Sequence, residues 1–162
     1  MPATYEPITT TTLSSAILNL DITSIPGTYT DLIVIMTGVP SANDTLQMRF
    51  NSNTSNYSRT RLSGDGSDAA SGRNTNQTRF TIADNKTTQP FFVEFDIFNY
   101  AGSTHKTMLY SYNLDRNGNG EVVKGVALWR NTAAITELNF FNQFGANFNS
   151  GTTVTIYGIL KA

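Results

Sequence analysis

The sequence predicts an all-β protein, folded as a single antiparallel, jelly-roll-like β-sandwich over residues 1–162. Three observations predict this class. Short apolar or alternating segments recur from end to end, segments rich in Gly, Asn, Ser and Thr separate them, and no stretch has sustained helical periodicity. A chain of 162 residues suits one domain. It buries roughly two-thirds of its unfolded surface, so its core needs no disulfide or metal.

The N-terminal part contains three predicted strands. Residues 16–22 alternate between apolar and polar side chains, as a half-buried strand does, before a Pro-Gly pair at 26–27 breaks the chain. Residues 32–39 are apolar on both faces, which predicts a central strand. Residues 46–50 alternate again, with Leu, Met and Phe on one face.

The C-terminal part is richer in strand signals. Residues 91–97 place Phe, Val and Ile on one face and Glu94 and Asp96 on the other. Further strands are predicted at 107–114, 121–130, 134–141 and 152–160. The count of eight or more strands favours a jelly roll among the possible sandwiches and barrels.

Residues 51–79 form a long polar segment, broken only by a short candidate strand at 57–62. About thirty residues with so little apolar content are not expected in a core. Long loops of this kind are usually functional or mobile. We therefore expect an insertion at one end of the sandwich.

Arginine is concentrated in and beside this segment. Five of the seven arginines fall between positions 49 and 79, namely Arg49, Arg59, Arg61, Arg73 and Arg79. Only Asp65 and Asp68 oppose them, and Tyr57 lies alongside. This composition predicts a docking surface for an acidic partner, either a protein or an anionic glycan. The alternative is arginine that keeps a solvent-facing strand and loop soluble.

Two late aromatic residues are candidates for contact with a neighbouring protein. Most aromatic side chains after residue 90 are expected in the core. Phe144 and Phe148 lie in the Gly- and Asn-rich stretch 142–151, where burial is harder.

One turn-like stretch resembles a cation site. Asp115 to Gly120 match the first half of a calcium-binding loop, with oxygen ligands at alternate positions before a glycine. The twelfth position is Val126 where such a loop has Glu. Two Asn-Gly pairs suit a tight hairpin, which is the favoured interpretation, and cation binding stays open.

Three patterns resemble parts of catalytic or phosphate-binding sites. Glu94 and Asp96 lie about 7 Å apart on one strand face, so an acid–base pair for glycoside hydrolysis is conceivable, but a solvated strand face is favoured. His105 is the lone histidine, without a nucleophile elbow in the sequence. Gly64-Asp65-Gly66 is interpreted as a turn. We therefore expect a non-enzymatic protein without a cofactor or metal.

Composition narrows the range of partners. Cysteine is absent, which fits maturation in a reducing cytoplasm. The net charge of −1 and the pI near 5.7 argue against bulk attraction to nucleic acid or anionic membranes. No apolar run reaches the roughly 18 residues of a membrane span, and the first residues lack the pattern of a signal peptide. Release by lysis, or as part of a larger particle, is expected.

Several phrases, taken together and in this order, resemble a domain common among structural proteins of tailed bacteriophages. They occupy residues 13–16, 25–34, 46–51, 56–57, 99–106, 128–135 and 155–159. They are short sequence motifs typical of packed strands and turns, and none of them is a catalytic signature. The resemblance implies a jelly-roll-like sandwich, often trimeric, of the kind found in capsid decoration proteins and tail fibres.

The resemblance therefore implies a capsid decoration (cement) protein of a virion assembled in the bacterial cytoplasm. The expected partners are two further copies, in a homotrimer, and the major capsid protein or other virion proteins. No coiled coil or repeat stalk projects the domain, as a fibre would require. The alternative is a tail-fibre or receptor-binding module that recognises host surface glycans.

Overall fold

The computed structural model describes residues 5–85, 89–115, 117–118 and 120–160. That part of the chain forms twelve β-strands and no helix. The strands are β1 (Tyr5–Thr12), β2 (Asn19–Ile22), β3 (Asp31–Gly38), β4 (Asp44–Phe50), β5 (Tyr57–Gly64), β6 (Ala69–Gln77), β7 (Phe80–Asn85), β8 (Phe91–Phe98), β9 (Lys106–Asp115), β10 (Gly120–Trp129), β11 (Leu138–Asn142) and β12 (Thr153–Ile159). The predicted all-β class is confirmed.

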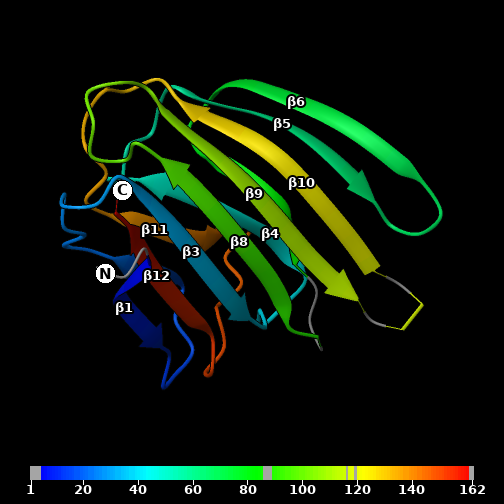
Figure 1. The fold of residues 1–162 in the computed structure, drawn as a ribbon. Helices are drawn as coiled ribbons and strands as arrows, with labels where there is room; N and C mark the ends of the chain where they lie inside the picture. Colours follow the sequence, from blue (N-terminus) through cyan, green and yellow to red (C-terminus); the bar gives the residue numbers. More distant parts are fainter. Residues whose placement is uncertain (1–4, 86–88, 116, 119, 161–162) are drawn as a thin grey trace.

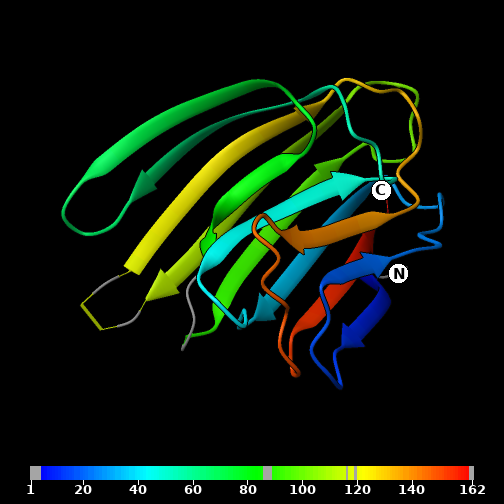
Figure 2. The ribbon, with the colours of Figure 1, turned by 180° about the vertical axis from the view of Figure 1, so that it is seen from behind.

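The strands form two layers, which Figures 1 and 2 show from opposite sides. The large sheet has eight strands in the order β1-β12-β3-β8-β9-β10-β5-β6, and the small sheet has four in the order β2-β11-β4-β7. Every pairing is antiparallel. The predicted antiparallel sandwich is confirmed.

The strand order is that of a jelly roll with two added hairpins. Without β5–β6 and β9–β10, each sheet keeps four strands, and β1-β12-β3-β8 faces β2-β11-β4-β7. The chain crosses between the layers as the two Greek keys of a jelly roll require. Both added hairpins join the large sheet beyond β8, so that sheet extends well past the small one.

The polar segment 51–79 is not the loop insertion that its composition predicts. Most of it forms the β5–β6 hairpin, which is one edge of the large sheet. The predicted strand at 57–62 is confirmed as β5, whereas β6 was not predicted. Almost every side chain of β6 is exposed, so this strand has no apolar alternation to reveal it.

Two other strands were not predicted. β1 is rich in threonine and forms the opposite edge of the large sheet, where it pairs only with β12. β7 is a short edge strand of the small sheet. In addition, the strand predicted at 134–141 begins only at Leu138.

The core lies between the two sheets and forms one continuous cluster. Inward and outward residues alternate along β3, which lies between β12 and β8 as a central strand should. Tyr57 and Trp129 stack at 6.0 Å between ring centroids. Phe50 and Phe80 meet edge to face at 5.2 Å, and Phe80 also packs on Tyr57 at 4.7 Å. This aromatic group anchors β5 and β10 to the small sheet.

Candidate interaction surface

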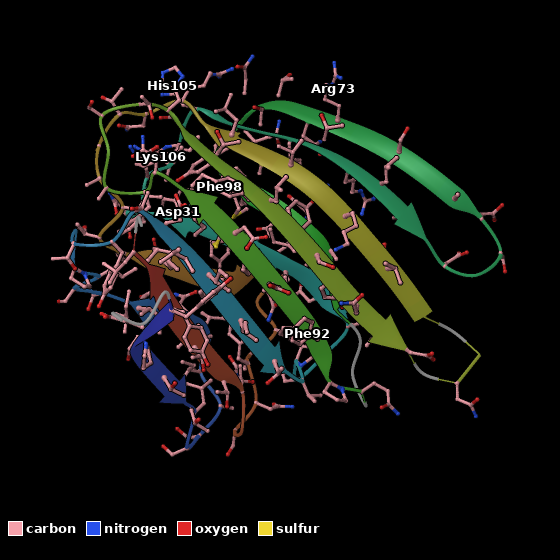
Figure 3. The ribbon with its side chains drawn as sticks, in the orientation of Figure 1. Asp31, Arg73, Phe92, Phe98, His105 and Lys106 are labelled. Atoms are coloured by element: carbon pink, nitrogen blue, oxygen red, sulfur yellow. The ribbon has the colours of Figure 1, made fainter. Side chains whose placement is uncertain are left out.

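One side of the large sheet faces the small sheet, and we call its other side the outer face. No layer of the described chain covers the outer face, which is turned towards the viewer in Figures 1 and 3. The odd-numbered side chains of β8 are buried in the core. The even-numbered ones lie on the outer face: Phe92, Glu94, Asp96 and Phe98. The prediction that Glu94 and Asp96 share one strand face, opposite the apolar one, is confirmed.

The outer face carries most of the exposed apolar side chains of the described chain. In the described chain as a whole, nine large apolar side chains are exposed. The strand registers place seven of them on the outer face: Tyr5, Leu62, Phe92, Phe98, Leu109, Val122 and Val126. A gathering of this kind on one face usually marks a binding surface.

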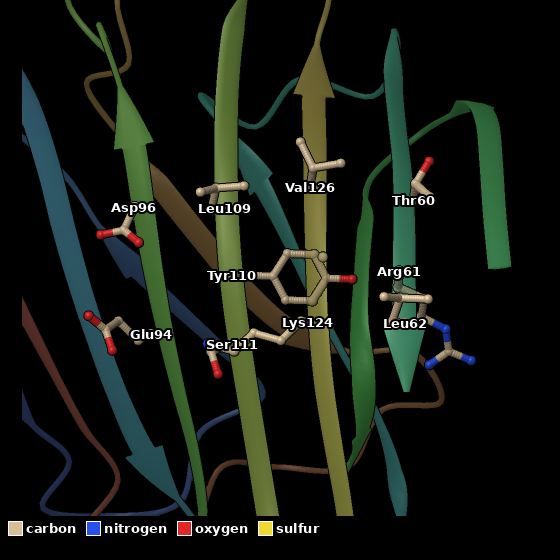
Figure 4. Close-up of a pocket in the computed structure, with 11 residues that line it drawn as sticks. Thr60, Arg61, Leu62, Glu94, Asp96, Leu109, Tyr110, Ser111, Lys124 and Val126 are labelled. Atoms are coloured by element: carbon tan, nitrogen blue, oxygen red, sulfur yellow. The ribbon is translucent and has the colours of Figure 1, made fainter. Parts of the chain in front are cut away.

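A shallow groove of about 490 Å³ runs across the middle of the outer face (Figure 4). Its apolar walls are Leu62, Leu109 and Val126, contributed by β5, β9 and β10. Glu94 and Asp96 lie at its β8 side. The groove is therefore amphipathic. It suits a ligand group that has an apolar body and that also carries partial or full charges.

Three charged side chains of the groove, Glu94, Asp96 and Lys124, have no ion-pair partner among the described residues. Within the part of the chain that the structure describes, Glu94 and Asp96 form no hydrogen bond or ion pair. Lys124 lies in the same row as Glu94, with Ser111 of β9 between them. Two strand spacings separate Lys124 from Glu94, or roughly 10 Å. The groove thus presents separate acidic and basic positions to a ligand.

The five arginines proposed as one docking surface do not gather. Arg59 and Arg61 have the same parity as buried Tyr57 on β5, so they lie on the core side of the hairpin. Arg73 lies on the outer face of β6 and donates to Thr60 Oγ1 over 3.4 Å.

The remaining two arginines lie near the small sheet. Arg49 Nε donates to Thr78 O over 3.1 Å, and its guanidinium lies 4.6 Å from the centre of the Phe141 ring. Arg79 donates to Thr78 Oγ1 over 3.1 Å. The arginines are therefore distributed over several surfaces, and a single basic docking surface is not formed.

Arg59 has a structural task that the sequence did not reveal. Its Nε donates to Asn74 Oδ1 over 2.9 Å, and its Nη1 donates to the backbone oxygens of Thr81 and Ile82. These bonds join β5, β6 and β7, and so fasten the added hairpin to the small sheet. Arg61 makes a longer ion pair with Glu121, 3.8 Å, and both side chains are partly exposed. Such a pair contributes little.

Replacing Arg59 by Ala is expected to lower the free energy of unfolding by about 1–3 kcal/mol, because backbone oxygens of β7 lose a charged donor. Hydrogen exchange should accelerate first in β5 and β6, which lose their attachment to β7. Arg73→Ala, at an exposed position, is the control and should stay within about 0.5 kcal/mol. Equal exchange rates in both variants would contradict the assigned task.

Two residues predicted to be at a partner surface are buried. Tyr57 and Phe148 are 0% exposed, so the expected exposure is wrong for both. The Tyr57 hydroxyl accepts from Phe50 N over 3.1 Å, and burial raises the pKa of this phenol to about 12. Phe148 forms isolated β-bridges with Ile17 and Pro40 that draw it into the core. Phe144 is 79% exposed, as expected.

Gly64-Asp65-Gly66 lies at the turn between β5 and β6. The predicted turn at Asp115–Gly120 includes residues 116 and 119, which lie outside the described residues, and within it Asn117 N donates to Asp115 Oδ1 over 2.8 Å. Asp65 Oδ1 accepts from Ser67 N and Asp68 N over 2.9 and 2.8 Å, and these backbone bonds lower the pKa of Asp65. His105 is exposed in the loop before β9 (Figure 3). The described residues contain no group of three or more His, Asp or Glu placed to hold a metal.

The chain matches no known family profile and no curated protein with which it was compared. The described residues contain no helix that is long and apolar enough to cross a membrane. The outer face and its groove are therefore the features on which a functional assignment can rest.

Proposed function

We propose that this protein is a non-enzymatic structural protein of a tailed-bacteriophage particle, namely a capsid decoration (cement) protein that binds the outside of the shell and stabilises it. The observation that carries the proposal is the outer face, an uncovered sheet surface with seven exposed large apolar side chains. Water contact with these side chains is unfavourable, at roughly 25 cal/mol per Å² of apolar surface. A permanent partner would relieve it.

The architecture supports the same role. Jelly rolls serve as capsid and lectin domains, in which the sandwich is a rigid scaffold and the contacts lie on its faces and edges. The phrases that resemble phage structural proteins fall largely on strands and turns of this scaffold. Their place in the fold fits a packing role.

Assembly with identical copies is part of the proposal. The large sheet ends in two edge strands, β1 and β6, whose unpaired backbone groups are available to neighbours. A homotrimer on the shell would cover such edges, and symmetry would repeat each weak contact many times. The proposed partners are the other two copies and the major capsid protein, and the proposed location is the virion.

The copy number in purified particles tests this proposal. Quantitative mass spectrometry should find hundreds of copies per particle, in fixed proportion to the major capsid protein. Val122→Glu, which adds a charge to the outer face outside the groove, should lower that number, whereas Thr54→Glu in an exposed loop should not. A handful of copies, or a few tens, would contradict a shell location and indicate the tail.

A receptor-binding or tail-fibre module is the second candidate, and the outward row of β8 favours it. Phe98 and Phe92 (Figure 3) bracket Asp96 and Glu94 (Figure 4) along one strand. Aromatic rings stack on sugar faces, and carboxylates accept hydrogen bonds from sugar hydroxyls. Binding of the purified protein to host surface glycans, abolished by Phe92→Ala and Phe98→Ala, would favour this candidate over the first.

A further inference from the structure

The exposed apolar side chains of the described chain fall into two separate groups. Seven lie on the outer face, and the other two are Leu18, 49% exposed, and Phe144, 79% exposed. Leu18 lies beside the turn that carries Phe144, since its Cδ1 is 4.0 Å from the position of a Cβ added at Gly145. We call Leu18 and Phe144 the knob. The knob belongs to the loops beside the small sheet, away from the groove of the outer face.

A buried carboxylate holds the knob in place. Asp44 is only 6% exposed, and its two oxygens accept from Phe144 N over 3.0 and 3.1 Å. One of them also accepts from Ala146 N over 3.0 Å. Gly145, between these two residues, has a φ of +87°, a conformation that a residue with a side chain rarely adopts. The turn is therefore specified by both a charge and a glycine.

The loop around the knob is fastened on both sides. Asn142 Nδ2 donates to Ala146 O over 2.9 Å. Ser41 N donates to Asn147 O over 2.8 Å, and Asn147 N donates back to Ser41 Oγ over 2.9 Å. These hydrogen bonds thus fix a loop conformation in which the apolar ring of Phe144 is exposed to water. Such preorganised aromatic side chains lose little entropy on binding and are typical interface anchors.

We propose that the knob of one copy inserts into the groove of the outer face of a second copy. The contact is heterologous, because it joins two different surfaces of the same chain. A heterologous contact gives a ring where its rotation closes and an open filament where it does not, and the contact proposed here is the one that closes a ring. The proposed contact does not depend on the function proposed above. Only the expectation that the ring contains three copies rests on that function.

The chemistry of the groove fits an aromatic ring. Leu62, Leu109 and Val126 provide apolar walls for its body. A ring is negative over its faces and positive at its edge. Lys124 can therefore meet a face, as in a cation–π contact, while the unpaired carboxylates of Glu94 and Asp96 meet the edge. The separation of Lys124 from Glu94 and Asp96 thus matches the different charges at the face and the edge of an aromatic ring.

A second copy is the favoured occupant because the described chain exposes one protruding and one recessed apolar surface. These have opposite shape, and they lie on different sides of the protomer. A two-fold contact through the outer face alone would leave the knob in water, and a reciprocal two-fold contact of knob with groove would need both on the same side of the protomer. A heterologous contact covers both surfaces at once and leaves neither apolar group exposed in a closed ring.

Sedimentation velocity and native mass spectrometry of the purified full chain test the contact. Wild type should form a closed oligomer, and Phe144→Ser and Val126→Lys should each be monomeric, with the dissociation constant raised at least about 30-fold. Tyr5→Ser removes an exposed aromatic ring from the outer face three strands away from β8 and should leave assembly unchanged. Leu109→Lys gives a second test of the groove should Val126→Lys unfold.

Mixing the two monomeric variants gives the decisive result. Phe144→Ser keeps an intact groove and Val126→Lys keeps an intact knob, so an equimolar mixture should form one-to-one heterodimers that cannot close into a ring. A monomeric wild type, an assembled Phe144→Ser, or a mixture without heterodimer would each overturn the proposal. Assembly through the knob combined with absence from the capsid would instead contradict the function and leave this contact standing.

Discussion

Replacing Lys106 by methionine is expected to lower the free energy of unfolding by about 3 kcal/mol, one of the two largest effects on stability anticipated for this chain. Lys106, which Figure 3 labels, is 0% exposed. Its Nζ donates to the backbone oxygens of Gly102, Thr104 and Thr132, the last two over 2.7 and 3.4 Å. Methionine fills a similar volume but leaves these oxygens without the donor.

The three oxygens lie in two loops at the same end of the sandwich. Gly102 and Thr104 precede β9, and Thr132 follows β10. Lys106 therefore ties these two loops together through their backbone oxygens. Urea unfolding at pH 7 measures the loss, and Lys124→Met, at an exposed position, is the control that should change the free energy by less than about 0.5 kcal/mol.

The pH dependence of this difference has a defined sign. Desolvation by burial lowers the pKa of Lys106 from its usual 10.5, so the folded chain binds fewer protons than the unfolded chain between the two pKa values. Stability rises with pH wherever the unfolded state binds more protons. The advantage of wild type over Lys106→Met should therefore grow as the pH rises towards 10.5. An advantage that shrinks over this range would contradict burial of a charged amine.

The second large effect is expected at alkaline pH and is due to Tyr57. Its hydroxyl accepts from Phe50 N and also lies within hydrogen-bond distance of Phe50 O and Asn53 O, at 3.2 and 3.1 Å. Burial raises its pKa from 10.0 to about 12. The folded state then binds more protons than the unfolded state, so this contribution is complete below pH 10 and is lost as the pH rises to 12. The loss amounts to about 2–3 kcal/mol.

Tyr57→Phe isolates this contribution. At pH 7 the variant should be less stable than wild type by about 1–3 kcal/mol, because the backbone of Phe50 loses a buried partner. Between pH 10 and 12 the two curves should converge. Tyr5→Phe, at an exposed edge position, is the control. Parallel curves for Tyr57→Phe and wild type across this range would show that the phenol is not buried in the folded state.

The strands that the sequence locates best are those with one solvent-exposed face and one buried face. β4 and β8 alternate strictly enough to be located from their apolar residues. β6 is exposed on almost every residue and β1 is partly wet on both faces, so neither has an apolar period. Their strand geometry comes from the backbone of a neighbouring strand, and the local sequence does not record that pairing.

The candidate surface was predictable only in fragments. Alternation places Glu94 and Asp96 on an outward face, but which strands extend that face depends on tertiary pairing. Parity alone relates Arg59 and Arg61 to Tyr57, so a buried Tyr57 directs both arginines inward. The aromatic ring of Tyr57 was the sequence feature that could have indicated its burial. The polar residues around Tyr57 made an exposed loop the expected structure instead. Phe148 was misjudged because two backbone bridges, absent from any local pattern, draw it into the core.

The pairing of β1 with β12 has a consequence for how the chain is made. β12 lies between β1 and β3 and joins the first residues of the described chain to nearly the last. During synthesis β1 has no neighbour, and β3 lacks one of its two, until β12 has emerged from the ribosome. The large sheet is therefore completed late, by contacts between distant residues, which form slowly. Until then the chain exposes an unpaired strand on each side of the missing one, and crowding of nascent copies favours aggregation in that interval.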